Sequence, residues 1–428
     1  MALRVLLLPL CALIVTACHP AAMLHKSDMP QRCQAPNPAE RMAAARASLV
    51  LRPYKPRDVY DVDGQGKVLR FFPGVVAPDA LAVVSFPQPL LFEGADEGFM
   101  QMAGRSFLYD NALVALWLLH EGDPGKARQV LSAVTALQKS DGSWGFSFST
   151  NRIDGYYNAS YVRTGTVAWV LYAYAHYRTL TGDGRFDDTI ARGIRWLLTQ
   201  HEVRTGLFYA GSGRWRSPRQ YEPYWAAQFF ATEHQIDIYF ALKAVSKALP
   251  ELAEQHGLPQ IAERLGHAML THLWLAEDQR FAQGKLENQV DTESALDAAG
   301  TWAALWLIAR GDRQRAVQAL DWVQRVHSLE IGGWQGLRPY RDVDPTTWFV
   351  EGSVAAPLAH WRLGQREQAQ APWDELLKLA CAGGVPLVYS PEWWQDFPLS
   401  PATAPTVWFL IAGSEIVENR PAWLWTEQ

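Results

Sequence analysis

The chain has 428 residues, and its 39 lysines and arginines against 44 aspartates and glutamates give a formal net charge of -5. A chain without excess positive charge has no strong field to hold a nucleic-acid backbone, so DNA and RNA binding are disfavoured. Hydrophobic residues make up 49% and charged residues 19%, the balance of a folded protein with a large core. The 19 tryptophans are far above ordinary usage and need a reason.

The first residues have the pattern of a secretory signal. A basic start at Met1 to Arg4 precedes the apolar stretch Val5 to Val15, which is too short to span a membrane. The following Thr16-Ala17-Cys18 completes a junction that resembles the lipobox of bacterial lipoproteins. This resemblance implies that residues 1–17 are removed as a signal peptide and that Cys18 carries the lipid.

The residues around Cys18 also carry expectations about location and redox state. His19 stands where an Asp usually retains such lipoproteins on the inner membrane, so the resemblance implies an outer-membrane lipoprotein of the cell envelope. Cys11 would be lost with the signal peptide. Cys33 and Cys381 would then remain, either as a disulfide pair or as two free thiols.

Residues 18–95 predict a tether and a small cap. Residues 18–38 contain four prolines and no hydrophobic period, which favours an extended spacer. Residues 39–95 form the cap: Ala39 to Leu49 is Ala-rich and helix-prone, and Val59 to Phe72 holds two runs of β-formers around a Gly-rich turn. From Asp96 onward the pattern changes to long helices.

Residues 96–428 contain a repeat of roughly 50 to 65 residues. Each unit runs from a polar start through an apolar helix, a short turn and an amphipathic helix to a loop rich in Gly and Trp. Six such starts predict six helical hairpins, and the sixth is expected to be closed by the helix at Ala39 to Leu49. The starts fall near residues 108–111, 161–164, 232–234, 294–297, 349–352 and 404–406.

The two helices of each unit differ in character. First helices such as Val167 to Tyr177 are apolar nearly all round, which requires enclosure on every side, whereas partners such as Arg313 to Arg325 keep one polar face. This difference predicts that the first helices form an inner ring and their partners an outer ring. The region resembles the six-hairpin glycosidase class of (α/α)6 barrels, which implies an all-α fold with an active site where the inner helices begin.

Acidic residues recur at these helix starts. Any one of them could be an ordinary helix cap. The set as a whole suggests catalytic carboxyl groups, because glycoside hydrolysis needs one protonated acid and one ionised base or nucleophile. Glu233 is the predicted general acid, because Asp237 lies one turn further along the same helix face and should raise the Glu233 pKa. For the second carboxylate we expect Glu351, with Asp110 next, and Asp297 suits the role equally.

Other polar and aromatic residues near the helix starts or in loops are predicted to contact a sugar, because an indole face stacks on a pyranose ring. Tryptophans inside helical segments, such as Trp169 and Trp306, are expected to be packing residues. The predicted substrate contacts are Asp237, His234, Arg163, Tyr109, Trp144, Trp215, Tyr224, Trp225, Trp334 and Trp348.

Together these patterns predict a membrane-anchored glycoside hydrolase that acts on an envelope or extracellular polysaccharide. The alternatives are a catalytically silent glycan-binding lipoprotein of a polysaccharide export or assembly system, or a lyase or epimerase with His234 or a tyrosine as its base. A terpene cyclase is disfavoured because Asp342-Val343-Asp344 is followed by Pro345. No cofactor and no metal are expected: no Cys cluster exists, and His267 and His272 fall on different helix faces.

Overall fold

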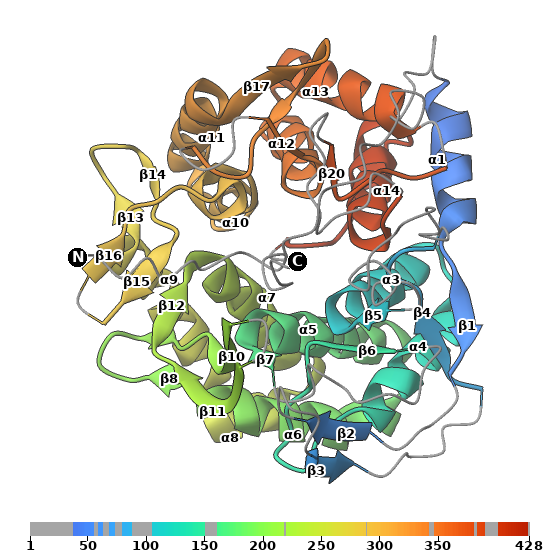
Figure 1. The fold of residues 1–428 in the computed structure, drawn as a ribbon, viewed down its shortest axis with the longest axis vertical. Coiled ribbons are helices and arrows are strands. Elements are labelled where there is room, and N and C mark those ends of the chain that lie inside the picture. Colours follow the sequence, from blue (N-terminus) through green and yellow to red (C-terminus); the bar gives the residue numbers. More distant parts are fainter. Residues whose placement is uncertain are drawn as a thin grey trace.

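Helices dominate the computed structural model and form two concentric rings around a common axis (Figure 1). The predicted (α/α)6 barrel is therefore confirmed. The structure describes residues 37–54, 59–62, 68–72, 79–87, 105–149, 161–217, 220–287, 289–341, 346–380, 383–389 and 401–426.

The inner ring consists of helices that are buried nearly all round, as their apolar sequences predict. In the last of them every residue from Thr403 to Glu415 is buried. The inner helices are α3 (Leu108–His120), α5 (Thr164–Thr181), α7 (Thr232–Ala248), α10 (Trp302–Ala309), α12 (Val350–Arg362) and α14 (Thr403–Ile416).

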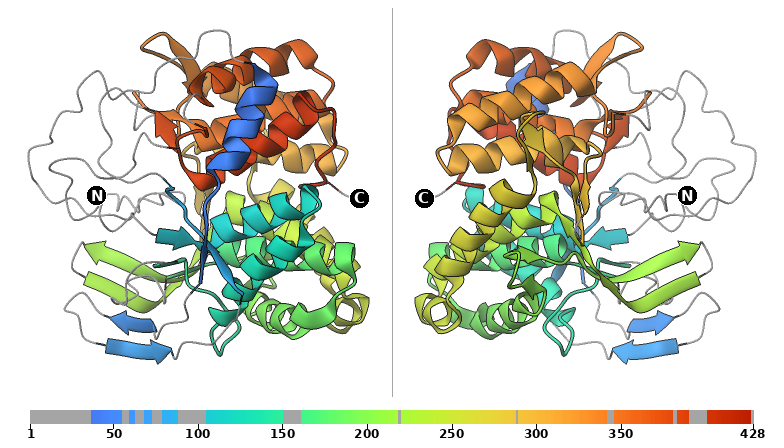
Figure 2. Two further views of the ribbon diagram at one scale, coloured as in Figure 1. Left: turned by 90° about the vertical axis from the view of Figure 1, so that its right-hand side faces the viewer. Right: turned by 90° about the vertical axis from the view of Figure 1, so that its left-hand side faces the viewer.

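The outer helices bury one face and expose the other. In α6 the buried face includes Ile190, Ile194 and Leu197, which are spaced at helical intervals. The outer helices are α4 (Pro124–Ala136), α6 (Asp187–Leu198), α9 (Leu258–His272), α11 (Arg313–His327), α13 (Arg366–Leu379) and α1 (Pro38–Ser48), with a short α8 (Pro250–His256) between α7 and α9. Helix α1 packs against α14 and closes the ring, as predicted (Figure 2).

Glycines make the tight turns between paired helices possible. Gly122, Gly182, Gly311 and Gly364 all lie in the left-handed region, with φ of 77°, 71°, 79° and 77°. Side chains other than glycine rarely adopt this conformation, so each glycine ends an inner helix and lets the chain turn back outward. A 3-10 turn, η2 (Gly184–Phe186), follows the second of them.

Short strands lead directly into four of the inner helices and pair with the returning chain. These leading strands are β5 (Arg105–Phe107), β7 (Val162–Arg163), β12 (Phe229–Ala231) and β19 (Trp348–Phe349). Their antiparallel partners are β6 (Ser147–Ser149), β10 (Gly211–Ser217) with β11 (Gln220–Ala227), β15 (Gly284–Leu286) with β16 (Gln289–Asp291), and β20 (Val388–Tyr389). The strands gather at one end of the barrel, where β10 and β11 project as a ribbon (Figure 2). This end therefore carries the starts of the inner helices.

The remaining strands belong to the N-terminal region and to the links between outer and inner helices. The predicted hairpin is confirmed by antiparallel pairing of β2 (Val59–Val62) with β3 (Val68–Phe72). The other pairs are β1 (Leu51–Pro53) with β4 (Leu81–Val83), β8 (His201–Glu202) with β9 (Leu207–Phe208), β13 (Trp274–Leu275) with β14 (Arg280–Phe281), and β17 (Ser328–Ile331) with β18 (Trp334–Leu337).

Four of the sequence predictions concern segments that are not described. The signal peptide, Cys18 and the tether to residue 36 lie outside the described residues, as do Cys33 and Cys381. In the part of the chain that is described, no helix has both the length and the apolar character needed to cross a membrane.

Candidate active site

The acidic residues at the inner-helix starts do not act as helix caps. Phe107, Ala231 and Phe349 precede α3, α7 and α12 in extended conformation, and none of them provides a side-chain capping bond. The acids Asp110, Glu233 and Glu351 lie instead within the first helical turns, where the helix dipole favours negative charge. All are buried, with 5%, 7% and 5% of their surface exposed.

Asp297 has a different local setting. The inner helix α10 is preceded by a π-helical turn, η3 (Asp297–Thr301), and such wide turns are frequent at functional sites. The backbone N–H of Ala298 donates to Asp297 Oδ1 at 2.7 Å. Burial raises the pKa of Asp297 to about 6, and backbone hydrogen bonds partly offset this rise. Asp297 is therefore mainly ionised at neutral pH.

Glu233 and Asp237 share one face at the start of α7. Burial raises the pKa of Glu233 well above its ordinary value, and repulsion from Asp297, Asp237 and Glu351 raises it further. The predicted direction is confirmed, but burial and Asp297 contribute more than Asp237 does. The pKa of Asp237 is also raised well above the usual range, by burial and by Asp297, while a hydrogen bond with the Trp169 side chain opposes the rise.

Glu351 is held by a chain of hydrogen bonds from two other inner helices. The Tyr109 hydroxyl donates to Glu351 Oε1 at 2.9 Å, and Trp408 Nε1 donates to the Tyr109 oxygen at 2.7 Å. Burial and the neighbouring Asp110 raise the pKa of Glu351 to about 8, against the opposing effect of the Tyr109 bond. Burial likewise raises the pKa of Asp110 to about 7, and a hydrogen bond with Ser85 opposes this rise.

His234 lies beside these acids but is not a cation. Burial and the neighbouring Arg163 lower its pKa to about 3, and its Nδ1 lies 3.1 Å from Thr164 Oγ1. Gly165 allows α5 and α7 to approach here, because a Cβ at that position would lie 2.7 Å from Asp237 Oδ2. His234 is thus a neutral imidazole at the edge of the acidic group.

The Arg163 side chain hydrogen-bonds backbone carbonyl groups. Its guanidinium donates to the carbonyls of Val162, Ser212 and Gly213 and lies 3.6 Å from the centre of the Tyr161 ring. These contacts fix β7 against β10. Arg163 therefore shapes the entrance to α5, and its expected contact with substrate stays a prediction.

The structure thus brings together carboxyl groups from four inner helices. In the described part of the chain none of them is in an ion pair, and no group of three His, Cys, Asp or Glu residues is arranged to hold a metal ion. Their raised pKa values and mutual repulsion mean that protonated and ionised carboxyl groups coexist near neutral pH. The members of this acidic cluster are Asp110, Glu233, Asp237, Asp297 and Glu351.

The chain matches no family model and no curated protein sequence. Solved structures share its fold. A D-mannose isomerase matches over 89% of this chain and 97% of its own, with a TM-score of 0.61 and 12% sequence identity. A glycosidase variant in complex with glucose matches over 79% and 92%, with a TM-score of 0.55 and 12% identity.

An α-amylase from Clostridium perfringens matches over 73% of this chain and 86% of its own, with a TM-score of 0.51 and 10% identity. At such low sequence identity these similarities establish the (α/α)6 fold alone.

Three of the predicted sugar-stacking tryptophans are instead core residues, so the prediction is wrong for them. Trp144, Trp334 and Trp348 have 0%, 3% and 1% of their surface exposed. Trp144 Nε1 donates to the Val134 carbonyl and Trp348 Nε1 to Ser353 Oγ, both at close range. Their loops fold back onto the barrel, and the indoles fill the space between helices.

The predicted aromatic contacts on the projecting ribbon have a mixed outcome. Trp225 is partly exposed on β11, and the Arg214 guanidinium lies 4.6 Å from its ring centre. Arg214 also pairs with Glu222 at 2.6 Å. The side chains of Trp215 and Tyr224 lie outside the described part of the structure.

An aromatic layer beneath the acidic cluster was not predicted as part of the site. Trp169 and Trp408 are buried in the core, yet each indole hydrogen-bonds a side chain of the cluster or its partner Tyr109. Trp302 stacks on Trp408, and Trp425 contacts all three indoles. A register signal existed in the sequence, because Trp169, Trp302 and Trp408 each lie five residues after the start of an inner helical segment.

Proposed function

We propose that this protein is a carbohydrate-active enzyme that hydrolyses glycosidic bonds at the acidic cluster. The observation that carries the proposal is a set of buried carboxyl groups with raised pKa values, none of them in an ion pair with a described residue, at the inner-helix starts of an (α/α)6 barrel. Glycoside hydrolysis uses such a pair, one carboxyl protonated and the other ionised. Glycosidases are also among the solved structures that share this fold.

In the proposed mechanism Glu233 is the general acid. Its raised pKa keeps it protonated at neutral pH, so it can donate its proton to the glycosidic oxygen as the bond to the anomeric carbon breaks. Asp297 is the proposed ionised partner, because the backbone N–H of Ala298 donates to its carboxylate and offsets part of the rise in pKa that burial causes. Asp297 attacks the anomeric carbon, or takes a proton from the attacking water.

Glu351 takes a supporting role in this assignment. With a pKa of about 8 it is largely protonated at neutral pH, and its Oε1 is already bound by Tyr109. Asp237 Oδ1 is buried and has no hydrogen-bond partner among the described residues, so a bound sugar can satisfy it.

The second candidate is an isomerase or epimerase on the same barrel. His234 favours it, because a buried neutral imidazole can abstract a proton next to a sugar carbonyl. The similarity in fold to a D-mannose isomerase is consistent with this chemistry. The glycosidase proposal is preferred because the acids outnumber this single imidazole among the described inner-helix starts.

The test is a substrate panel with the full-length chain purified in detergent. Neutral, amino and uronic-acid polysaccharides are assayed for new reducing ends, and free hexoses are assayed in deuterated water for isomerisation with deuterium uptake. New reducing ends with oxygen-18 from labelled water at the anomeric carbon support hydrolysis. Ultraviolet-absorbing unsaturated ends identify a lyase, deuterium uptake identifies an isomerase, and binding without turnover identifies a glycan-binding protein; each of these contradicts the proposal.

We also propose that the protein is an outer-membrane lipoprotein of the cell envelope that acts on an envelope or extracellular polysaccharide. The lipobox-like junction at Cys18 and the His19 that follows it support this. In bacteria fed labelled palmitate, the full-length chain is expected to carry label and to sediment with outer membranes. Cys18→Ser is expected to lose both, and label that persists in this variant would contradict the proposal.

A further inference from the structure

The end of the chain passes into the centre of the barrel from the side opposite the acidic cluster. After α14 the chain turns inward, and the C-terminus lies near the axis in Figure 1 and away from the strand end in Figure 2. Trp425 is 1% exposed, although it lies only three residues from the end of the chain.

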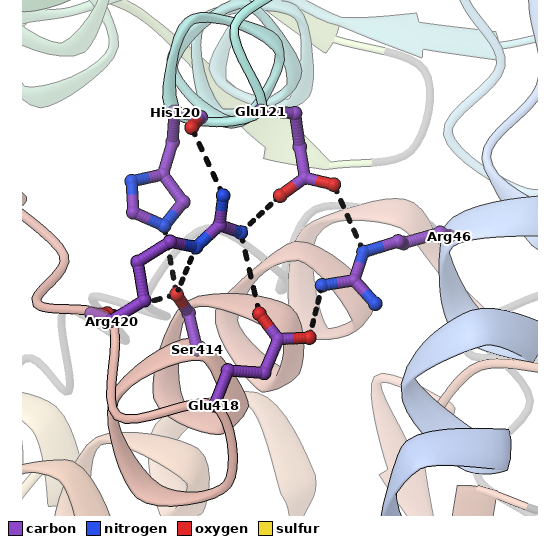
Figure 3. Close-up of polar contacts among 6 residues, drawn as sticks. All are labelled: Arg46, His120, Glu121, Ser414, Glu418 and Arg420. Atoms are coloured by element: carbon purple, nitrogen blue, oxygen red, sulfur yellow. Dashed lines mark hydrogen bonds and ion pairs between the residues drawn. The ribbon is translucent and has the colours of Figure 1, made fainter.

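The segment that carries Trp425 is anchored at its beginning by a charged cluster (Figure 3). Arg420 pairs with Glu121 at the end of α3 and with Glu418, and it donates to Ser414 Oγ at 3.3 Å. Arg46 of α1 pairs with the same two glutamates. Its Nε lies 3.0 Å from Glu121 Oε2, and its guanidinium also pairs with Glu418. The cluster therefore ties the C-terminal segment to three helices.

A second anchor holds the segment at its far end. Arg362 of α12 pairs with Glu415 at 2.6 Å, and both side chains are about nine-tenths buried. The same guanidinium donates to the carbonyls of Ala422, Leu424 and Trp425. The Trp425 N–H donates to the Tyr172 hydroxyl at 3.0 Å. Such a set of bonds specifies one path for the chain.

Trp425 itself adopts a backbone conformation that is unfavourable for a bulky residue. Its φ is +52°, in the left-handed region that glycine and asparagine favour. Strained residues persist when surrounding contacts over-determine them, and they cluster at functional sites. The anchors described above supply those contacts, so the strain indicates that the position of this indole matters.

The Trp425 indole contacts aromatic rings from four inner helices. It stacks on Phe240 with centres 5.3 Å apart and planes 8° from parallel. Its centre lies 5.1 Å from that of Trp169 and 5.3 Å from those of Trp302 and Trp408. Two of these neighbours hold the acidic cluster, because Trp169 bonds Asp237 and Trp408 bonds Tyr109, which in turn bonds Glu351.

We propose that Trp425 is a positioning residue of the active site. By holding the indoles of Trp169 and Trp408 from the opposite end of the barrel, it fixes Asp237 and the Tyr109–Glu351 pair in their working geometry. The inference rests on the proposed function for its kinetic consequence. Its structural consequence, that the packing around the acids depends on the end of the chain, can be measured without any substrate.

The test compares Trp425→Ala with Trp425→Phe and with Trp423→Ala. Trp423 is the matched control, because it comes from the same segment but stacks on His176, with ring centres 4.2 Å apart, and not on the indoles beneath the acids. Trp425→Ala is expected to lower kcat by roughly 10- to 100-fold with little change in KM, since small displacements of catalytic groups have effects of this size. Trp425→Phe should restore most of the loss, and Trp423→Ala should leave kcat within about twofold of the parent.

A second measurement is independent of turnover. Carbodiimide-mediated labelling of Asp237 and Glu351 with a small amine, followed by peptide mass spectrometry, is expected to accelerate several-fold in Trp425→Ala and not in Trp423→Ala. A parent without activity but with this labelling pattern would overturn the proposed function and leave the positioning role supported. Equal labelling in the two alanine variants, or equal kcat losses that follow their thermal stabilities, would overturn the role of Trp425. If Trp425→Ala does not fold, Trp425→Leu is compared with Trp423→Leu, and the same difference in labelling is expected because leucine also lacks the ring that packs on the indoles.

Discussion

The two ends of this barrel differ in how their acidic residues are partnered. At the start of the inner helices, Asp110, Glu233 and Glu351 are buried without a described arginine or lysine partner. At the opposite end, Glu121, Glu415 and Glu418 are all paired with arginines. Helix dipoles favour carboxylates at helix starts and disfavour them at helix ends.

The comparison shows that paired and unpaired acids have different uses. An acid paired with arginine links segments, as Glu415 does for the C-terminal segment. An unpaired buried acid has a raised pKa and can exchange a proton near neutral pH. The paired acids at the ends of the inner helices therefore stabilise the chain, whereas the unpaired acids at the starts of the inner helices can perform acid–base chemistry.

The largest expected effect follows from removing the proposed acid. Glu233→Gln should lower kcat by roughly 10²- to 10⁴-fold, because general acid catalysis contributes this much. The measurement is the release of reducing ends from the best substrate of the panel. Glu251→Gln is the control, since Glu251 is also a first-turn glutamate but is exposed on α8. A Glu233→Gln variant as active as this control would exclude Glu233 as the acid.

The same chemical substitution should change stability in opposite directions at the two ends. Glu415→Gln leaves Arg362 buried without its partner and should cost about 3–5 kcal/mol of unfolding free energy. Glu351→Gln should stabilise the fold at pH 8 by an amount on the order of a few kcal/mol.

The sign for Glu351 follows from its raised pKa. Above the ordinary value of 4.5 the unfolded chain loses the proton, whereas the folded chain keeps it to about pH 8, so stability falls as pH rises through this window. Gln removes that loss at pH 8 and has no such benefit at pH 4. Urea unfolding of the parent and of Glu351→Gln at both pH values measures the effect, and a stability difference between them that is the same at pH 4 and pH 8 would contradict the assignment.

A smaller effect is expected at the bond between Tyr109 and Glu351. Tyr109→Phe removes the donor to Glu351 and the acceptor for Trp408 Nε1, and should lower kcat roughly tenfold, as the loss of one hydrogen bond to a carboxyl group allows. Loss of the bond should also raise the pKa of Glu351 further, since the bond lowers it. Steady-state kinetics measure the first effect, and an unchanged kcat would show that Tyr109 is a packing residue only.

The smallest kinetic effect is expected for Trp144, which was wrongly predicted from the sequence to stack on a sugar. Trp144→Phe removes a buried indole and its bond to Val134, so it should cost about 1–3 kcal/mol of stability. KM and kcat should stay within about twofold of the parent, because the side chain does not line the acidic end. A large rise in KM would restore the original interpretation of Trp144 as a sugar-stacking residue.

The sequence predicted the barrel well because its signals are local. Apolar helices such as Val167–Tyr177, glycines at helix ends and acids in first turns repeat along the chain, and each can be interpreted within one unit. The expected helix starts at Leu108, Thr164 and Thr232 coincide with those of α3, α5 and α7.

The parts that the sequence could not predict depend on contacts between distant segments. Trp425 meets Trp169 across some 250 positions, and no repeat pattern signals that the end of the chain returns to the axis. The backbone hydrogen bonds that offset the raised pKa of Asp297 lie in a π-helical turn, and such a turn has no clear sequence signature.

The central claim, that Asp297 and Glu233 act as base and acid, is tested most directly by the pH dependence of kcat/KM. The account predicts a bell-shaped profile: activity rises with pH as Asp297 loses its proton near pH 6 and falls at higher pH as Glu233 loses its own. In Asp297→Asn the residual kcat/KM should no longer fall at low pH, so the acid limb of the profile disappears. A parent profile that stays flat from pH 7 down to pH 4, or an acid limb that persists unchanged in Asp297→Asn, would contradict it.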